Sequence, residues 1–256
     1  MVYPENPDSD KKRVKFFDSN CIKLNTPPIT QYLPQLERCR VSKLPLPITD
    51  NLKMPLSQTL SKYRANIQKA NSYIKLAYIQ DSHGHYIYST EAQHFITDVA
   101  FLKMFMAWES FLEASFTKYL LGQLSATGNV IHRYVFPKNY NHAHSILINV
   151  DWDNPEMVRQ MAKLYFEDGE PFETYIKAVN SDLLDLRTIR NAALYLSSSN
   201  SCQLDALATR LLKTSCSNIN VSQLILSIDP NSSINQTILD AYQLRLDIAA
   251  KGIASA

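Results

Sequence analysis

Four polar residues late in the chain have types and a spacing suited to chemistry: two guanidinium groups, a carboxamide and a phenol. They are Arg187, Arg190, Asn191 and Tyr195. On a continuous helix, residues four apart share a face, so Arg187, Asn191 and Tyr195 would lie together with Arg190 beside them. Guanidinium groups match the oxygens of a phosphate bidentately. This spacing therefore suits a site for a phosphate-bearing ligand.

Two charges occupy positions where the helical pattern requires apolar residues. Glu109 lies seven residues from both Leu102 and Phe116, so it falls on an apolar stripe of its helix. Arg190 lies seven residues after Leu183, on the apolar face of a later helix. A charge removed from water costs several kcal/mol unless it is paired. We expect the two helices to face each other through these charges.

The expected pairing can take more than one form. Glu109, or its neighbour Glu113, would hold Arg190 or Arg187 in the core of the bundle. A plain buried ion pair that only stabilises the fold is the alternative to a functional site. The residues alone leave both interpretations open.

The spacing of apolar residues predicts that helices position these groups. The chain has only five glycines, with no internal repeat and no glycine-rich phosphate loop. Residues 123–152 predict an irregular connection, and the alternating pattern of residues 219–228 predicts a short strand or an extended loop. The sequence predicts an all-α bundle, with helices over about 57–79, 91–122, 154–169, from 171 through the Arg190 cluster, 203–214 and 235–252.

The first 56 residues have a different composition, because eight of the twelve prolines precede residue 56. Proline removes a backbone donor and disfavours the helical region for the residue before it. Residues 1–56 are therefore predicted to form an extended Pro-rich N-terminal arm, with one short helix near residues 32–40. The arm would pack on its own domain or on a partner, and residues 57–256 would form the helical domain.

Bulk composition excludes several classes of protein. With 45% hydrophobic and 20% charged residues, the chain can bury a substantial core. A net charge of +2 argues against a non-specific nucleic-acid binder, so any contact with RNA would be local. The start of the chain lacks the apolar region of a signal peptide, and no run of 18 apolar residues is present. We expect a cytoplasmic protein with no membrane contact.

Neither a metal site nor a cofactor site is predicted. Four cysteines lie far apart without a C-x-x-C pair, which is typical of reduced thiols and not of a zinc site or a disulfide framework. Histidines occur as H-x-H pairs, but nothing completes a ligand set. In a dimer, His142 or His144 could reach Arg190 and supply an imidazole there.

Three segments carry a resemblance to a known family. The run IRNAALYLS (Ile189–Ser197) resembles the late-helix motif of HEPN domains, in which R-N-x-x-x-H or a similar R-x4–6-H element occurs. The run MAWESFLEASFTKYLLG (Met106–Gly122) resembles the early helix of the RiboL-PSP-type branch. The run DWDNPEMVRQMAKLYFEDGEPF (Asp151–Phe172) also resembles that branch. The resemblance covers about residues 57–252 and leaves the Pro-rich arm uncovered.

The resemblance implies an all-α, HEPN-like helical bundle that often forms symmetric dimers, with the motif faces meeting in a composite cleft. Many such proteins are metal-independent ribonucleases of toxin–antitoxin and anti-phage defence systems. In that chemistry the histidine moves protons while the arginine binds the scissile phosphate, a division that suits a group titrating near neutrality.

The chain departs from the motif at its last position. Arg190 and Asn191 match, but Tyr195 stands where the family has histidine, and no histidine follows His144. A phenol with a pKa near 10 is a poor general base at neutral pH. We therefore expect a non-catalytic or weakly active subunit that binds RNA or a cognate defence-system partner, with a homodimer as the expected assembly. An active endoribonuclease with Arg190 and a relocated acid–base group is the alternative, and a purely structural helical scaffold is the second.

Overall fold

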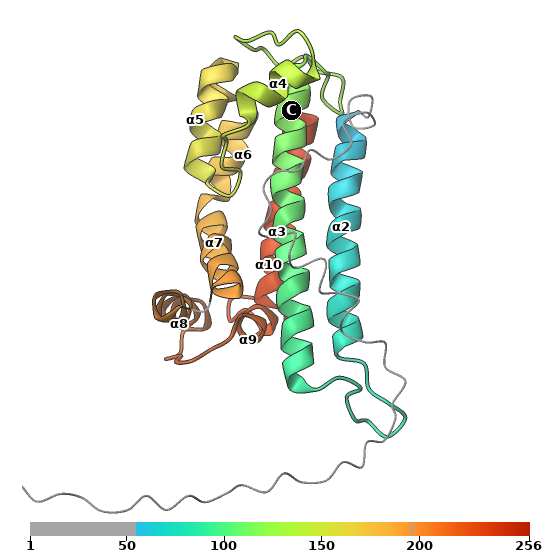
Figure 1. Cartoon of the computed structure of the whole chain (residues 1–256), viewed down its shortest axis with the longest axis vertical. Coiled ribbons are helices and arrows are strands. Elements are labelled where there is room, and N and C mark those ends of the chain that lie inside the picture. The colour runs from blue at the N-terminus through green and yellow to red at the C-terminus, as the bar shows by residue number, and fades with distance from the viewer. Residues whose placement is uncertain (1–54, 196) are drawn as a thin grey trace, which may run out of the picture. The chain divides into compact units, whose positions relative to one another are not determined.

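The computed structural model describes residues 55–195 and 197–256, so the Pro-rich arm lies outside the described residues, as does the short helix expected near residues 32–40. The described part is all-α, as predicted. It contains nine α-helices, one 3-10 turn and isolated β-bridges, without a named strand (Figure 1). The helices are α2 (Leu56–Ala77), α3 (Thr90–Leu120), α4 (Tyr140–Leu147), α5 (Pro155–Tyr165), α6 (Phe172–Ala178), α7 (Asn180–Leu194), α8 (Ser198–Leu212), α9 (Val221–Leu226) and α10 (Ile238–Ser255).

The two longest helices, α2 and α3, form an antiparallel hairpin close to the predicted bounds. Ser89 begins α3, because its side chain accepts a hydrogen bond from the backbone N–H of Ala92. Buried residues occur on nearly all sides of α3, and the packing explains why. α3 lies in the middle of the bundle, with α2 on one side and α7, α9 and α10 on others (Figure 1).

The helices after α3 differ from the sequence prediction in several places. α8 begins at Ser198, five residues before its predicted start, and α5 ends at Tyr165, four residues before its predicted end. Residues 123–152 are not wholly irregular, because α4 forms there, started by the side chain of Asn139. The helix predicted from residue 171 is two helices, α6 and α7, which meet at Val179. Residues 219–228 were predicted as a strand or loop, and this was wrong. They hold the short helix α9, whose start is a capping box between Asn220 and Gln223.

The core is rich in aromatic side chains where α3 meets the segment around α5 and α6. The ring of Phe116 lies 4.8 Å from the rings of both Phe166 and Phe172, centroid to centroid. Trp152 contacts the same ring edge-on at 5.5 Å. Aromatic pairs of this geometry stabilise a core beyond their buried area. This cluster fixes the loop before α5 against the C-terminal part of α3.

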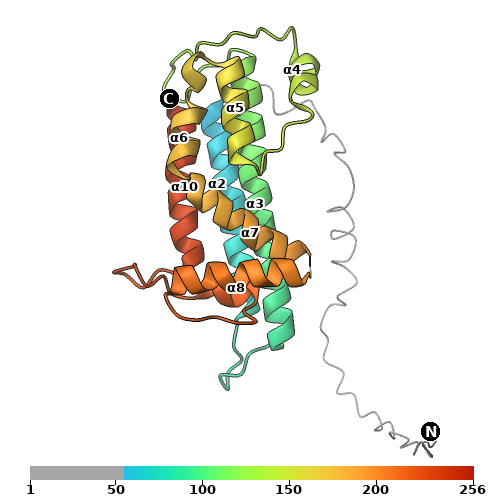
Figure 2. The same cartoon turned by 90° about the vertical axis from the view of Figure 1, so that its left-hand side faces the viewer.

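The last helix closes the bundle against α2, α6 and α9. Gly252 allows a close approach to α6, since a Cβ atom at this position would lie 2.1 Å from the ring of Tyr175. Figure 2 shows α8 running across one end of the bundle, next to α7. The described residues thus place α7 between the central α3 and the peripheral α8, with the Arg190 cluster on its inner side.

Candidate functional site

Arg190 of α7 projects towards α3 and meets two carboxylates there. Its Nη1 atom donates a hydrogen bond of 2.6 Å to Oδ2 of Asp153, and its Nη2 atom lies 3.8 Å from Oε1 of Glu109. The guanidinium carbon also lies 5.5 Å from the centre of the Phe105 ring, within the range of a cation–π contact. The predicted pairing of Glu109 with Arg190 across two facing helices is therefore present, although Asp153 is the closer partner.

Asp153 is the site residue that the sequence analysis missed. It lies on the loop before α5, with its side chain only 7% exposed. Its Oδ1 atom lies 3.7 Å from Nε of Arg187, whose Nη2 atom lies 3.9 Å from Oδ2 of Asp151. A loop carboxylate has no helical period that would predict its direction. The only signal was its position directly before the start of α5.

The two arginines share three carboxylates, and burial raises the pKa of two of them, Glu109 and Asp153. Removal from water raises the pKa of Glu109 to about 7, against the opposing influence of Arg190. Burial also raises the pKa of Asp153, helped by a hydrogen bond with Asp151 and opposed by Arg190. The carboxyl group of Glu109 therefore titrates closer to neutrality than an ordinary glutamate does.

Glu113 lies one helical turn beyond Glu109 on α3, but it does not pair with an arginine in the described structure. Its Oε1 atom lies 3.8 Å from Nδ1 of His144, which α4 carries. The His144 ring stacks on that of Tyr140, with centroids 6.0 Å apart and planes inclined by 5°. His144 was expected to approach Arg190 from a second copy in a dimer. The structure instead places it beside the same stripe of α3 within one chain.

Tyr195 does not share a helical face with Arg187 and Asn191, so that prediction was wrong. Helix α7 ends at Leu194, and Tyr195 has extended backbone angles (φ −131°, ψ 108°) with a side chain that is 62% exposed. The side chain of Asn200 donates hydrogen bonds to the backbone carbonyls of Asn191 and Tyr195. These bonds satisfy two carbonyl groups at the end of α7.

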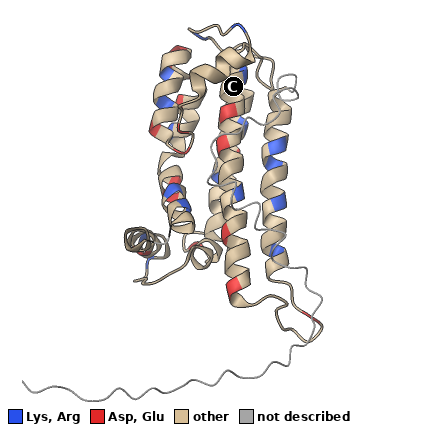
Figure 3. Cartoon of the chain, in the orientation of Figure 1, with Lys and Arg blue, Asp and Glu red and all other residues tan. Residues whose placement is uncertain are grey.

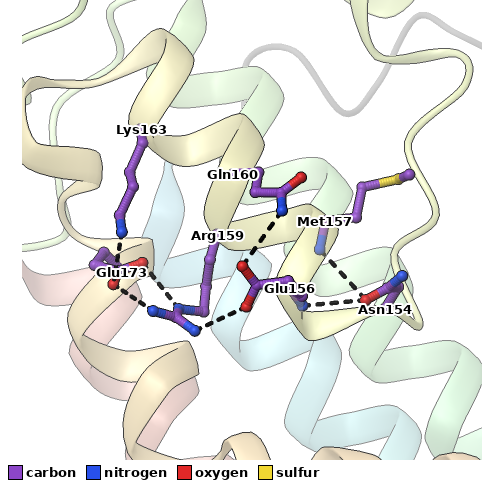
Figure 4. Close-up of polar contacts among 7 residues, drawn as sticks. All are labelled: Asn154, Glu156, Met157, Arg159, Gln160, Lys163 and Glu173. Carbon is purple, nitrogen blue, oxygen red and sulfur yellow. Dashed lines mark hydrogen bonds and ion pairs between the residues drawn. The ribbon is translucent and has the colours of Figure 1, made fainter.

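A second arginine–carboxylate cluster joins α5 to α6 (Figure 4). Arg159 donates to both carboxylate oxygens of Glu173, at 2.9 and 2.6 Å, and to Glu156 at 2.9 Å. Lys163 adds a second cation 3.2 Å from Glu173. Here the hydrogen bonds from Arg159 hold the pKa of Glu173 down at about 2. This cluster has the usual electrostatics of a structural ion pair.

Within the part of the chain that the structure describes, no group of three His, Cys, Asp or Glu side chains is arranged to hold a metal ion. None of the helices described is both long enough and apolar enough to cross a membrane. Comparisons with protein-family models, with curated proteins and with solved structures gave no match.

Proposed function

We propose that this chain is a degenerate HEPN-like protein, a non-catalytic or weakly active subunit that binds RNA or a cognate protein in a prokaryotic anti-phage defence or toxin–antitoxin module. The proposal rests on the residues that resemble the HEPN motif and on the state of Arg190. The observation that carries it is the 2.6 Å bond from Arg190 to Asp153, with Glu109 at 3.8 Å. The motif arginine is thus already neutralised inside its own chain.

Electrostatics explain why such a site would be a poor catalyst. A scissile phosphate near Arg190 would have to displace or approach the carboxylates of Asp153, Glu109 and Asp151, and like charges at this range repel. Tyr195 lies beyond the end of α7, outside the regular helix that carries Arg190 and Asn191. Loss of a proton-transfer residue commonly costs about 10²–10⁴ in rate. This geometry therefore favours weak or absent turnover at Arg190.

A cleavage assay tests the proposal directly. The full chain is incubated with structured RNA, with and without EDTA, beside an Arg190→Ala variant and an Arg159→Ala variant as a matched arginine control. We expect no cleavage above the background of the Arg190→Ala protein. Cleavage that survives EDTA, is lost in Arg190→Ala and persists in Arg159→Ala would overturn the proposal.

The second candidate is an active metal-independent endoribonuclease, and one arrangement favours it. Glu113 lies one helical turn along α3 from Glu109 and contacts His144 of α4, and burial raises the pKa of Glu109 to about 7. Glu109 could therefore exchange protons near neutrality. If cleavage is found, His144→Gln and Glu109→Gln should abolish it, whereas His83→Gln in the exposed hairpin loop should not.

The assembly that we propose is a homodimer or a complex with a cognate protein. The exposed phenol of Tyr195 at the end of α7 would lie in the contact. Light scattering coupled to size exclusion gives the mass of the full chain in solution. A monomer over the whole accessible concentration range would contradict the homodimer and leave the cognate partner.

A further inference from the structure

The loop between α3 and α4 carries an unusual combination of exposed aromatic rings and cations. No Asp or Glu occurs in this loop, residues 121–139, which contains two cationic residues, Arg133 and Lys138, and one histidine, His132. Two of its aromatic side chains are among the most exposed apolar groups described, Tyr134 at 61% and Phe136 at 69%. Phe is usually buried, so two exposed rings in an acid-free segment require an explanation.

The backbone of this segment is held by hydrogen bonds to neighbouring parts of the fold. Arg133 forms an antiparallel bridge with Phe166, and the N–H of Tyr134 donates to the carbonyl of Tyr165 at 2.9 Å. The N–H of Glu167 in turn donates to the carbonyl of His132 at 3.1 Å. Before the segment, the N–H of Ala126 donates to the last turn of α10 at 2.7 Å. The loop is thus anchored to α5 and α10.

Exposure alternates along this segment, although its backbone bends at Tyr134. Ile131, Arg133 and Val135 are partly buried, while the residues between them are exposed. The exposed row is His132, Tyr134, Phe136 and Lys138.

The guanidinium group of Arg133 packs against one of the two rings, that of Phe136. Its guanidinium carbon lies 4.9 Å from the centre of the Phe136 ring, and the group packs against Gly122, where a Cβ atom would lie only 2.4 Å from its nitrogens. Gly122 has a φ of +80°, so glycine suits both the backbone and this close approach. Contact on one side with Arg133 orders the ring, and most of its surface stays open to solvent.

We propose that the exposed row of His132, Tyr134, Phe136 and Lys138 binds single-stranded nucleic acid, with bases stacked on the two rings and phosphates beside the cations. Aromatic platforms combined with positive charge are the recognition mode of such ligands, and every base has a face that can stack. The absence of carboxylates from this stretch favours a polyanion over a protein partner. The segment that pairs with this loop, residues 165–168, contributes two acidic residues, Glu167 and Asp168. The site lies outside the Arg190 cluster. It rests on the proposed function of RNA binding and specifies single-stranded nucleic acid as the ligand and this loop as the binding surface.

The test measures fluorescence anisotropy of labelled single-stranded oligo-U RNA, oligo-dT and an RNA hairpin duplex with the full chain. We expect both single strands to bind more tightly than the duplex, with affinity that falls as salt is raised. The double variant Tyr134→Ala, Phe136→Ala should lose about tenfold for each ring. Tyr134→Phe keeps the ring and should bind like the wild type, as should Val130→Ala, an exposed apolar residue of the same loop.

Charge variants sharpen the assignment. Lys138→Gln should weaken binding several-fold and reduce the salt dependence, whereas Lys69→Gln on the basic outer side of α2 should not. Glu167→Gln removes a repelling carboxylate and should strengthen binding about twofold. All the substituted side chains are exposed, so the variants should fold, as circular dichroism can check.

Three results would overturn the inference. One is that no oligonucleotide binds to the wild-type chain at low salt, and another is that the double ring variant binds as the wild type does. The third is that Arg190→Ala abolishes binding while the ring variant does not, which would move the ligand to the Arg190 cluster and leave the proposed function standing. A self-association that needs Tyr134 and Phe136, without nucleic-acid binding, would assign the rings to a protein contact.

Discussion

Two arginine–carboxylate clusters in this bundle have the same chemical groups and opposite electrostatics. At the junction of α5 and α6, Arg159 and Lys163 both serve Glu173, and its pKa falls to about 2. At the junction of α3 and α7, Arg190 and Arg187 are shared among Glu109, Asp151 and Asp153, and burial raises the pKa of Glu109 to about 7.

The difference teaches that the supply of hydrogen-bond donors, and not the presence of an arginine, decides how a buried carboxylate titrates. Glu173 accepts two short bonds from one guanidinium, whereas Glu109 lies 3.8 Å from Arg190, whose short bond goes to Asp153. A carboxylate that loses water without gaining donors prefers to be protonated. Figure 3 shows the wider setting, in which α2 carries mainly Lys and Arg and α3 mainly Asp and Glu. The α5–α6 cluster therefore has the electrostatics of a structural ion pair. The α3–α7 cluster, with its raised carboxyl pKa, has the electrostatics of a candidate functional site.

The largest expected effect comes from removing the shared cation. Arg190→Ala should lower the free energy of unfolding by about 2–4 kcal/mol at pH 7, because it leaves Asp153 and Glu109 partly buried and facing each other. Urea unfolding gives the value. Adding Asp153→Asn to this variant should restore part of the loss. A loss below that of Arg159→Ala would contradict the comparison.

The next effect concerns the pH dependence that Glu109 confers. Its pKa is raised above the ordinary value of 4.5, so between pH 4.5 and 7 the folded state binds more protons than the unfolded state. Stability should therefore fall as pH rises through this window. Relative to Glu109→Gln, the wild type should lose about 1–3 kcal/mol between pH 5 and 8, measured by urea unfolding. If the free energy of unfolding depended on pH in the same way for the wild type and for Glu109→Gln, this prediction would be wrong.

The α5–α6 cluster should respond in the opposite direction. The pKa of Glu173 lies below its ordinary value, so its contribution to stability is present above pH 4.5 and is lost as pH falls towards 2. Arg159→Ala should cost about 1–2 kcal/mol at pH 7 and flatten the acid limb of the stability profile. Glu156→Gln, whose side chain is 59% exposed, is the matched control and should change little.

The smallest effect is expected at Arg187. Its guanidinium lies 3.7 Å from Asp153 and 3.9 Å from Asp151, and its side chain is 37% exposed. Pairs of this length near the surface contribute little, so Arg187→Ala should cost about 0.5 kcal/mol or less in urea unfolding. A cost equal to that of Arg190→Ala would show that the two arginines act as one buried unit.

The sequence predicts most of the fold because a long run of apolar residues at helical spacing specifies a helix and its buried face. The hairpin of α2 and α3 follows from such periods almost to the residue. The short helices were not predicted correctly. The apolar spacing continues from α6 into α7 and hides the break at Val179, and α9 has only six residues, too few to establish a period.

The candidate site was predicted in part, and for a similar reason. The facing of Glu109 and Arg190 follows from misplaced charges on two periodic helices. Asp153 escaped prediction because a loop residue has no fixed direction, and Tyr195 was misplaced because α7 ends one residue before it. The row of His132, Tyr134, Phe136 and Lys138 did carry a signal, a period of two in an acid-free stretch, which the long irregular segment concealed.

The hairpin of α2 and α3 also has a consequence for how the chain folds. These helices follow each other directly and pack along each other more extensively than any other pair described, so their contacts are local in sequence and close only a short loop. Arg190, by contrast, must find Asp153 and Glu109 across 37 and 81 positions. We expect core substitutions such as Phe111→Leu to slow refolding, and Arg190→Ala mainly to speed unfolding, in stopped-flow chevron plots. Equal changes in both rates for the two variants would argue against this order of assembly.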